Sequence, residues 1–248
     1  MDIVIVLIAA FCAGVLNTIA GGGTFLTFPA LVFIGLPPVV ANATSAVAVF
    51  PGYLGGALGF RAELARFDKA RMLKLLAVTF AGGLIGSLLL LVSSNKAFSV
   101  VVPFLLLAAT LAFLFGDQIR RWAAQKSRAV TPFGSVGLLL VSIYGGYFNG
   151  GLGIVLLALF ALWGMVDLHE MNGLKNGLSF ALSAISVAVF AVGGLVEWQH
   201  AVGMMVASTL GGYAGAPIAR MLPKSVVRAL IAVVGFSMSA VFFWRLIA

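Results

Sequence analysis

One stretch near the start of the sequence combines hydrogen-bond donors with a chain break between two short apolar segments. It contains an asparagine, two threonines and three consecutive glycines: Asn17, Thr18, Gly21, Gly22, Gly23 and Thr24. Carboxamides and hydroxyls are neutral donors, and backbone N–H groups at a helix N-terminus attract anions. The stretch therefore predicts an anion cradle, or alternatively a tight turn between two packed helices.

The same kind of stretch occurs again in the second half of the sequence. An asparagine is again followed by glycines, at Asn149, Gly150, Gly151 and Gly153. Irregular backbone inside a hydrocarbon layer survives only where it is buried in protein or lines a watery cavity. Two such breaks favour a shared polar site over two unrelated turns.

A second pair of polar clusters follows these two breaks. Asn42, Thr44 and Ser45 begin an apolar segment in the first half, and Asn172, Lys175 and Asn176 begin one in the second. A charged residue near the bilayer centre costs roughly 2.5 to 3.5 kcal/mol on insertion scales, so such residues usually face a cavity. Lys175 is thus a candidate ligand for an anion, unless it reaches the cytoplasmic interface instead.

Titratable groups other than Lys175 are few in the apolar part of the chain. His169 and Glu170 are candidates for proton coupling, although both also fit an interfacial position. The sequence has no His-Glu-x-x-His, Walker or Gly-x-Ser-x-Gly pattern. Cys12 is the single cysteine, which excludes a cysteine-built metal site. We therefore expect no enzyme, no metal and no cofactor.

The composition defines the class of protein that must position these residues. Hydrophobic residues make up 62% of the 248 and charged residues 9%, with a mean hydropathy of +1.16. Long apolar runs predict membrane-spanning helices rather than the alternating strands of a barrel. The net charge of +8 comes from residues in loops beside these runs, so the positive-inside rule explains it without nucleic acid. We predict an all-α polytopic membrane protein in a lipid bilayer.

Ten apolar segments are arranged as five, a basic linker and five. The first repeat covers 1–115, the linker 116–131 and the second repeat 132–248. The first two segments of each repeat are short and flank the Gly-rich break. The first-half segments are Ile3–Leu16, Thr24–Leu36, Val39–Phe60, Leu75–Val92 and Ala97–Phe115, and those of the second half are Phe133–Phe148, Leu152–Val166, Gly177–Val196, Ala201–Ala219 and Val226–Ile247.

Three landmarks recur in the same order in both halves. The asparagines at 17 and 149 are 132 residues apart, those at 42 and 172 are 130 apart, and the glycine patterns at 82–86 and 211–215 are 129 apart. Near-constant spacing indicates a duplicated unit. Small residues four positions apart also let membrane helices pack closely, so we expect the glycines of the third landmark to serve packing.

The distribution of basic residues predicts the orientation. Twelve of the fifteen Lys and Arg residues fall in 61–74, 116–131 and 220–228, whereas 93–96 and 197–200 contain only Lys96. The first three regions are therefore predicted to be cytoplasmic, which places both termini outside. Each half then crosses the membrane an odd number of times. The repeats have inverted topology, whether the short segments span or form hairpins.

At Asn17–Pro29, Gly35–Pro37, Asn42–Ser45, Asn149–Gly153, Asp167–His169, Met171–Asn176 and Gly211–Gly215, the chain resembles the TauE/SafE family of sulfite exporters, also called TSUP. The resemblance spans the whole chain. It implies a bacterial inner-membrane carrier for sulfite, sulfonates or other small sulfur-containing or organic anions. In many members the second glycine cluster is longer than the Asn149–Gly153 stretch of this chain, which leaves the exact ligand open.

Together these features predict export of a small anion, most plausibly sulfite or an organosulfonate, by alternating access at a midplane site. The alternative is an anion channel lined by the same donors. The termini are expected in the periplasm, and the oligomeric state is left open.

Overall fold

The computed structural model describes residues 2–19, 23–126, 133–221 and 224–247, and these residues form twelve helices and no strand. In the first half the main helices are α1 (Asp2–Ile19), α2 (Thr24–Phe33), α3 (Pro38–Gly59), α5 (Lys69–Val92) and α6 (Asn95–Leu114). In the second half they are α8 (Ser135–Tyr147), α9 (Leu152–Leu162), α10 (Leu168–Val192), α11 (Trp198–Met221) and α12 (Lys224–Ile247). The all-α prediction is confirmed, and each predicted apolar segment corresponds to a helix.

Two additional helices lie in the polar connections. α4 (Arg61–Leu64) joins α3 to α5, and α7 (Gly116–Gln125) begins the predicted linker. Among the described residues, α5, α6 and α10 are each long and apolar enough to cross a membrane. Large apolar side chains on the outer surface, including Val92, Val192 and Phe33, are more than three-quarters exposed. Such a surface is suited to contact with lipid tails.

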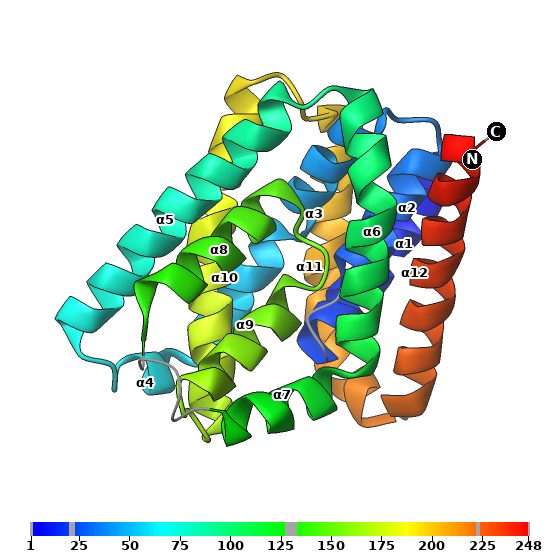
Figure 1. Ribbon diagram of the computed structural model, residues 1–248. Coiled ribbons are helices and arrows are strands. Elements are labelled where there is room, and N and C mark those ends of the chain that lie inside the picture. The colour runs from blue at the N-terminus through cyan, green and yellow to red at the C-terminus, as the bar shows by residue number, and fades with distance from the viewer. Residues whose placement is uncertain (1, 20–22, 127–132, 222–223, 248) are drawn as a thin grey trace.

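The first two helices of each half form a hairpin, so the chain returns to the end of the bundle at which that half begins. α1 packs against α2, and the connection from α2 to α3 lies at the same end of the molecule as the start of α1 (Figure 1). α8 and α9 form the corresponding hairpin from the opposite end. α3 and α10 then run the length of the bundle in opposite directions.

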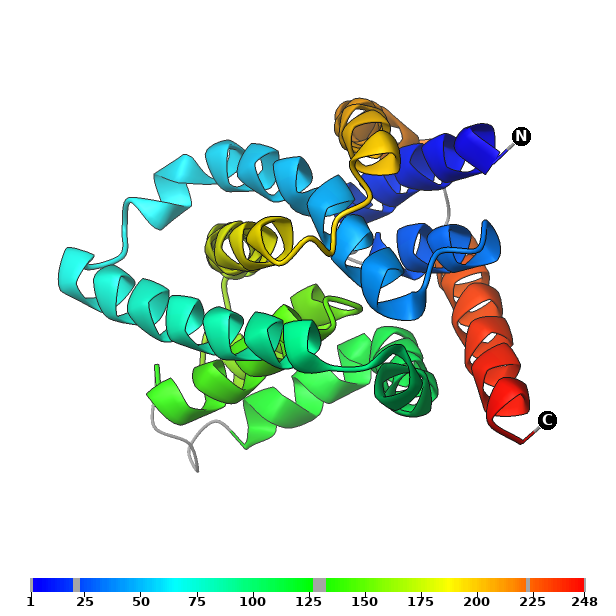
Figure 2. The same ribbon diagram turned by 90° about the horizontal axis from the view of Figure 1, so that it is seen from above.

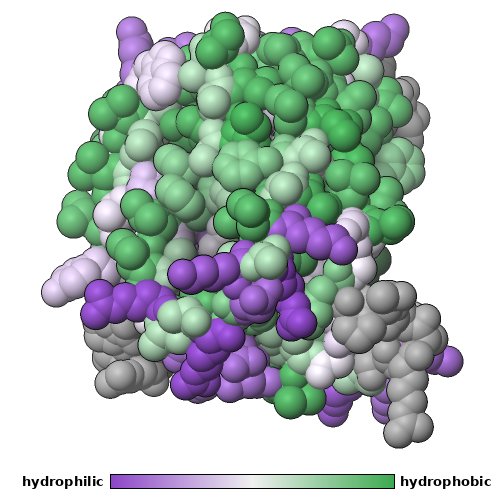
Figure 3. Space-filling model, turned by 90° about the vertical axis from the view of Figure 1, so that its left-hand side faces the viewer, coloured by the Kyte–Doolittle hydropathy of each residue, from purple (hydrophilic) through white to green (hydrophobic). Residues whose placement is uncertain are grey.

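The two ends of the bundle differ in charge. The connection from α3 to α5, the helix α7, the end of α11 and the start of α12 all lie at one end, here called the basic end. The described basic residues there are Arg61, Arg66, Lys69, Arg71, Lys74, Arg120, Arg121 and Lys126. Figure 3 shows a hydrophilic band toward this end below a broad apolar surface. The first turn of α1 and the last turn of α12 lie at the other end. The basic loops thus share one end as predicted, and their cytoplasmic location stays a prediction.

The largest helix–helix contacts join one half of the chain to the other. α1 packs mainly on α11 and α8 mainly on α5, while α3 contacts α10 and α6 contacts α12. Seen from above, α3 and α10 lie between the α1–α11 pair and the α5–α8 pair (Figure 2). This pattern is expected of two copies related by a two-fold axis. The inverted orientation of these copies in a membrane stays a prediction.

Glycines allow α1 to pack closely against α11, and α5 to pack closely against α8. A Cβ added to Gly211 would overlap the carbonyl oxygen of Phe11 in α1, and one added to Gly86 would overlap that of Ile143 in α8. A Cβ on Gly82 would lie 2.9 Å from the carbonyl oxygen of Leu139. The predicted packing role is confirmed for Gly82, Gly86 and Gly211.

The half of the core away from the basic end is rich in aromatic side chains. Phe28 of α2 lies 6.4 Å from Phe98, 5.9 Å from Phe148 and 6.0 Å from Phe242, measured between ring centroids. All four rings are almost completely buried. They join α2 to α6, α12 and the segment between α8 and α9.

The glycine crossing predicts a large stability difference between two Gly→Ala variants. Gly86→Ala should lower the free energy of unfolding by about 1–3 kcal/mol, because the α5 and α8 backbones must separate. Gly59→Ala is the matched control, since a Cβ there meets nothing within 4 Å. Thermal unfolding in detergent measures both. Equal midpoints for the two variants would contradict the packing role.

Candidate functional site

A cavity of about 460 Å³ lies among α1, α3, α10 and α11. Its described lining residues are Gly14, Asn17, Val49, Pro51, Gly52, Tyr53, Gly55, Gly56, Phe60, Gly153, Asn172, Lys175, Asn176, Ser179, Ser208, Thr209, Gly212 and Tyr213. None of these residues is acidic. The lining comes from the second half of α3, the first half of α10 and the second half of α11. Since α3 ends and α10 begins at the basic end, the cavity lies in the basic half of the bundle.

α10 contributes a continuous polar stripe to the cavity. Asn172, Lys175, Asn176 and Ser179 follow one another at i, i+3, i+4 and i+7, which places them on one helix face. Asp167 begins this helix by accepting hydrogen bonds from the N–H groups of His169 at 2.8 Å and Glu170 at 3.4 Å. The Asp167 N-cap therefore helps to fix the residue at which α10 starts. It thereby helps to set the position of the stripe residues along the cavity.

Lys175 is the only cation among the residues that line the cavity. Its side chain is 7% exposed, and its Nζ donates a hydrogen bond of 3.0 Å to Oδ1 of Asn172. The described residues provide no carboxylate partner for it. Burying an ammonium without a counter-charge is costly. The cavity thus presents a positive charge that an anion would neutralise.

Two further polar side chains line the same cavity, those of Ser179 and Tyr53. Ser179 is 1% exposed, and its hydroxyl has no hydrogen-bond partner within the described structure. Tyr53 donates from its hydroxyl to Oδ1 of Asn149 at 3.2 Å. Neither residue was among the sequence-predicted ligands. Ser179 could have been found by continuing the helical spacing one turn beyond Lys175, whereas no sequence signal marked Tyr53.

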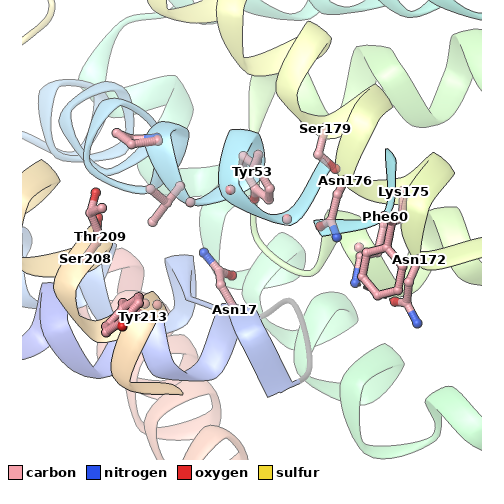
Figure 4. A pocket seen from close by; sticks show the side chains of 18 residues that line it. Asn17, Tyr53, Phe60, Asn172, Lys175, Asn176, Ser179, Ser208, Thr209 and Tyr213 are labelled. Carbon is pink, nitrogen blue, oxygen red and sulfur yellow. Dashed lines mark hydrogen bonds between the residues drawn. The ribbon is translucent and has the colours of Figure 1, made fainter. Parts of the chain in front are cut away.

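The opposite wall is formed by α11 and the end of α1. Figure 4 shows Ser208, Thr209 and Tyr213 on one side, the α10 stripe on the other, and Asn17 between them. Thr209 and Tyr213 are exposed, with Tyr213 89% accessible, so this wall reaches the surface. The sequence prediction missed these α11 residues, because Ser208 and Thr209 precede the glycine pattern at 211–215, Tyr213 lies within it, and that pattern was assigned to packing.

Asn17 closes the break between α1 and α2. Its Oδ1 accepts a hydrogen bond of 2.8 Å from the backbone N–H of Gly23, six residues later. A Cβ on Gly23 would lie 2.8 Å from Nδ2 of Asn17 and 2.7 Å from the carbonyl oxygen of Ala13, so glycine is required there. Thr24 is buried at the start of α2. Gly21 and Gly22 lie outside the described residues, as does the side chain of Thr18.

The second break is satisfied differently. Gly151 precedes α9 with a φ of +72°, a conformation that favours glycine, and the hydroxyl of Tyr144 donates to the carbonyl oxygen of Gly150. Asn149 accepts from Tyr53 and lies 3.5 Å from the Ser183 hydroxyl through its Nδ2. Of the four residues predicted at this break, Gly153 lines the cavity and Asn149, Gly150 and Gly151 do not.

The polar cluster on α3 lies away from the cavity. Asn42 donates through Nδ2 to the carbonyl oxygen of Tyr147 at 2.9 Å, and Thr44 accepts from the backbone N–H of Glu197 at 3.0 Å. The Ser45 and Thr27 hydroxyls lie 2.6 Å apart. The three predicted residues therefore hold α3 to its neighbours, and a direct role in binding stays a prediction.

His169 and Glu170 lie at the basic end outside the cavity lining. His169 is exposed and its ring lies 6.2 Å from that of Phe60, while Glu170 pairs with Arg66 at 3.6 Å. Phe60 itself lines the cavity, so His169 is one side chain away from it. Proton coupling through this pair stays a prediction.

Comparison with known proteins gives a consistent result. The family described as "Sulfite exporter TauE/SafE" matches residues 6–242. A probable membrane transporter protein of Haemophilus influenzae is 30% identical over 246 residues, covering 97% of this chain and 96% of that protein. A probable membrane transporter protein of Sinorhizobium is 27% identical, covering 94% of this chain and 88% of that protein. The probable membrane transporter protein YfcA of Escherichia coli K12 is 27% identical, with 93% and 86% covered. No solved structure matches the chain significantly.

The cavity predicts selective reactivity of introduced thiols. In a Cys12→Ser background, Asn176→Cys should react with a charged, membrane-impermeant thiol reagent, because Asn176 lines a water-accessible cavity. Ser45→Cys is the matched control, since Ser45 is 0% exposed and lies outside the lining. Mass spectrometry of labelled membrane vesicles measures both. Equal labelling of the two thiols would show that the cavity is not open to water.

Proposed function

The chain belongs to the TauE/SafE sulfite exporter family, and from that premise we propose that this membrane transporter exports a small oxyanion, sulfite or an organosulfonate. The observation that carries the proposal is Lys175, a buried ammonium in a cavity lined by no described carboxylate. Asn172 accepts a hydrogen bond from this ammonium. The carboxamide of Asn176 and the unpartnered hydroxyl of Ser179 line the same cavity. These groups can donate several hydrogen bonds to one oxyanion, and those to a charged group are the stronger kind.

The difference between the two halves supports a carrier with an alternating site. At the repeat spacing of 130 residues, the α10 stripe corresponds to Asn42, Ser45, Ala46 and Val49 on α3. Asn42, Ser45 and Ala46 lie outside the cavity lining and are at most 5% exposed, whereas Val49 lines the cavity. Ala46 belongs to the same buried cluster as Phe28. One half is thus open and its counterpart closed. Exchange of these two arrangements between the repeats would move the opening from one end to the other.

The same donors could instead line a channel. A channel in its conducting state needs a continuous water-filled path across the membrane. In the described part of this structure, the cavity lies in the basic half of the bundle, and helices are in tight contact in the other half. Asn42, Thr44 and Ser45 are bonded to neighbouring helices in that closed half. The asymmetry therefore favours the carrier.

The expected direction of transport follows from the membrane potential. We place the basic end in the cytoplasm of a bacterial cell, by the positive-inside rule, and both termini in the periplasm. The cavity then lies in the cytoplasmic half of the bundle. A monovalent anion leaving a cell at 100 mV, inside negative, gains about 2.3 kcal/mol from the field. Export therefore requires no coupling ion.

Replacing Lys175 should abolish most anion transport. Lys175→Gln removes the charge and is expected to weaken oxyanion binding by about 10- to 100-fold, as for loss of a hydrogen bond to a charged group. The measurement is the current of proteoliposomes on a solid-supported membrane after jumps of sulfite, sulfoacetate or chloride. Wild-type protein should give saturable currents with sulfite or sulfoacetate and none with chloride.

Lys74→Gln is the matched control for charge, because Lys74 is exposed on α5 at the basic end. It should transport like the wild type, and the thermal midpoints of all three proteins should agree. An unchanged sulfite current in Lys175→Gln would remove this cavity as the site. Absence of current with every anion in the wild type would contradict electrogenic anion export.

A further inference from the structure

The helix α7 differs from the other helices in position and in character. It lies across the basic end of the bundle, whereas α6, which leads into it, runs along the bundle (Figure 1). Its sequence is Gly-Asp-Gln-Ile-Arg-Arg-Trp-Ala-Ala-Gln, with Lys126 directly after it. A helix that lies in the plane of the membrane surface is rich in Lys and Arg on its polar face and carries Trp, Phe or Leu on its apolar face.

One face of α7 is anchored to the bundle. Ala123 is 1% exposed and belongs to the same buried cluster as Leu152, Leu156 and Phe160 of α9. At the start of α7, a Cβ on Gly116 would lie 3.3 Å from Cγ2 of Ile154. α7 is therefore fixed against the helix whose first turn contains Gly153, a residue that lines the cavity.

The other face of α7 is basic and aromatic. Trp122 is 58% exposed, and Arg121 and Lys126 are exposed beside it. Arg120 is paired with Asp117 at 3.5 Å, and Arg121 donates through Nε to the carbonyl oxygen of Asp117 at 3.3 Å. No described carboxylate forms an ion pair with Arg121 or Lys126. This face offers two exposed cations and an exposed indole.

We propose that the exposed face of α7 binds anionic phospholipid headgroups at the basic end of the protein. Arg121 and Lys126 contact the headgroup phosphates, and Trp122 lies at the boundary between headgroups and acyl chains. The partner is inferred from charge complementarity, because a zwitterionic surface offers no net attraction for the two cations. A bound lipid also holds α7 against α9, so anionic lipid should raise the thermal stability of the protein. This inference does not depend on which substrate is transported.

The test compares lipid binding by the full-length protein and two double variants. Arg121→Gln with Lys126→Gln removes the two unpaired charges, and Lys69→Gln with Lys74→Gln removes two exposed charges from α5 at the same end. Native mass spectrometry measures binding of phosphatidylglycerol and of phosphatidylcholine with the same acyl chains. The α7 variant should bind phosphatidylglycerol about 30-fold more weakly, from the usual contribution of a basic residue at an anionic surface taken for both residues together. The α5 variant should bind nearly as the wild type does.

Thermal unfolding with each added lipid gives a second measurement. Phosphatidylglycerol should raise the midpoint of the wild type and the α5 variant more than phosphatidylcholine does, and the difference should vanish in the α7 variant. Quenching of Trp122 by brominated phosphatidylglycerol, lost in Trp122→Phe, would locate the lipid on α7. Equal lipid binding by the two double variants, or no preference for phosphatidylglycerol in the wild type, would overturn the proposal.

Discussion

The structure depends on how the chain satisfies its backbone where two helices stop inside an apolar bundle. At such a depth, an unpaired N–H or C=O group costs several kcal/mol, so each break needs a dedicated partner. At the first break the partner is the carboxamide of Asn17, which accepts from Gly23. At the second, Tyr144 donates to the carbonyl of Gly150, and Asn149 is held by Tyr53. The residues that end the helices are thus also the residues that position the neighbouring polar groups.

The two breaks differ in whether their asparagine lines the cavity, and the candidate site reflects this difference. Asn17 lines the cavity, whereas Asn149 is 5% exposed and bonded to α3 and α10. Lys175 has a buried serine, Ser45, as its counterpart at the repeat spacing. Under the predicted duplication and the proposed function, unlike residues at equivalent positions keep one anion-binding wall while both halves share the same packing. The glycine crossings of α1 with α11 and of α5 with α8 serve that packing in both halves.

The sequence predicted the helices well because long apolar runs between basic loops leave few alternatives in a bilayer. It also identified the polar end of α10, since a lysine and two asparagines in an apolar context are conspicuous. It did not separate Asn17, which lines the cavity, from Asn42 and Thr44, which bond to other helices, because all three have the same local pattern. Tyr53 and Thr209 were missed for a related reason: their role depends on which helices meet, and that information is tertiary.

The central claim is that an oxyanion binds beside Lys175. The most direct measurement is a crystal structure with selenite, a pyramidal analogue of sulfite whose selenium can be located by anomalous scattering. The expected result is a single strong peak in the cavity, with an oxygen about 2.7 to 3.2 Å from Nζ of Lys175 and further oxygens facing Asn176 and Ser179. An empty cavity at a selenite concentration that supports transport, or a peak confined to another part of the protein, would contradict the claim.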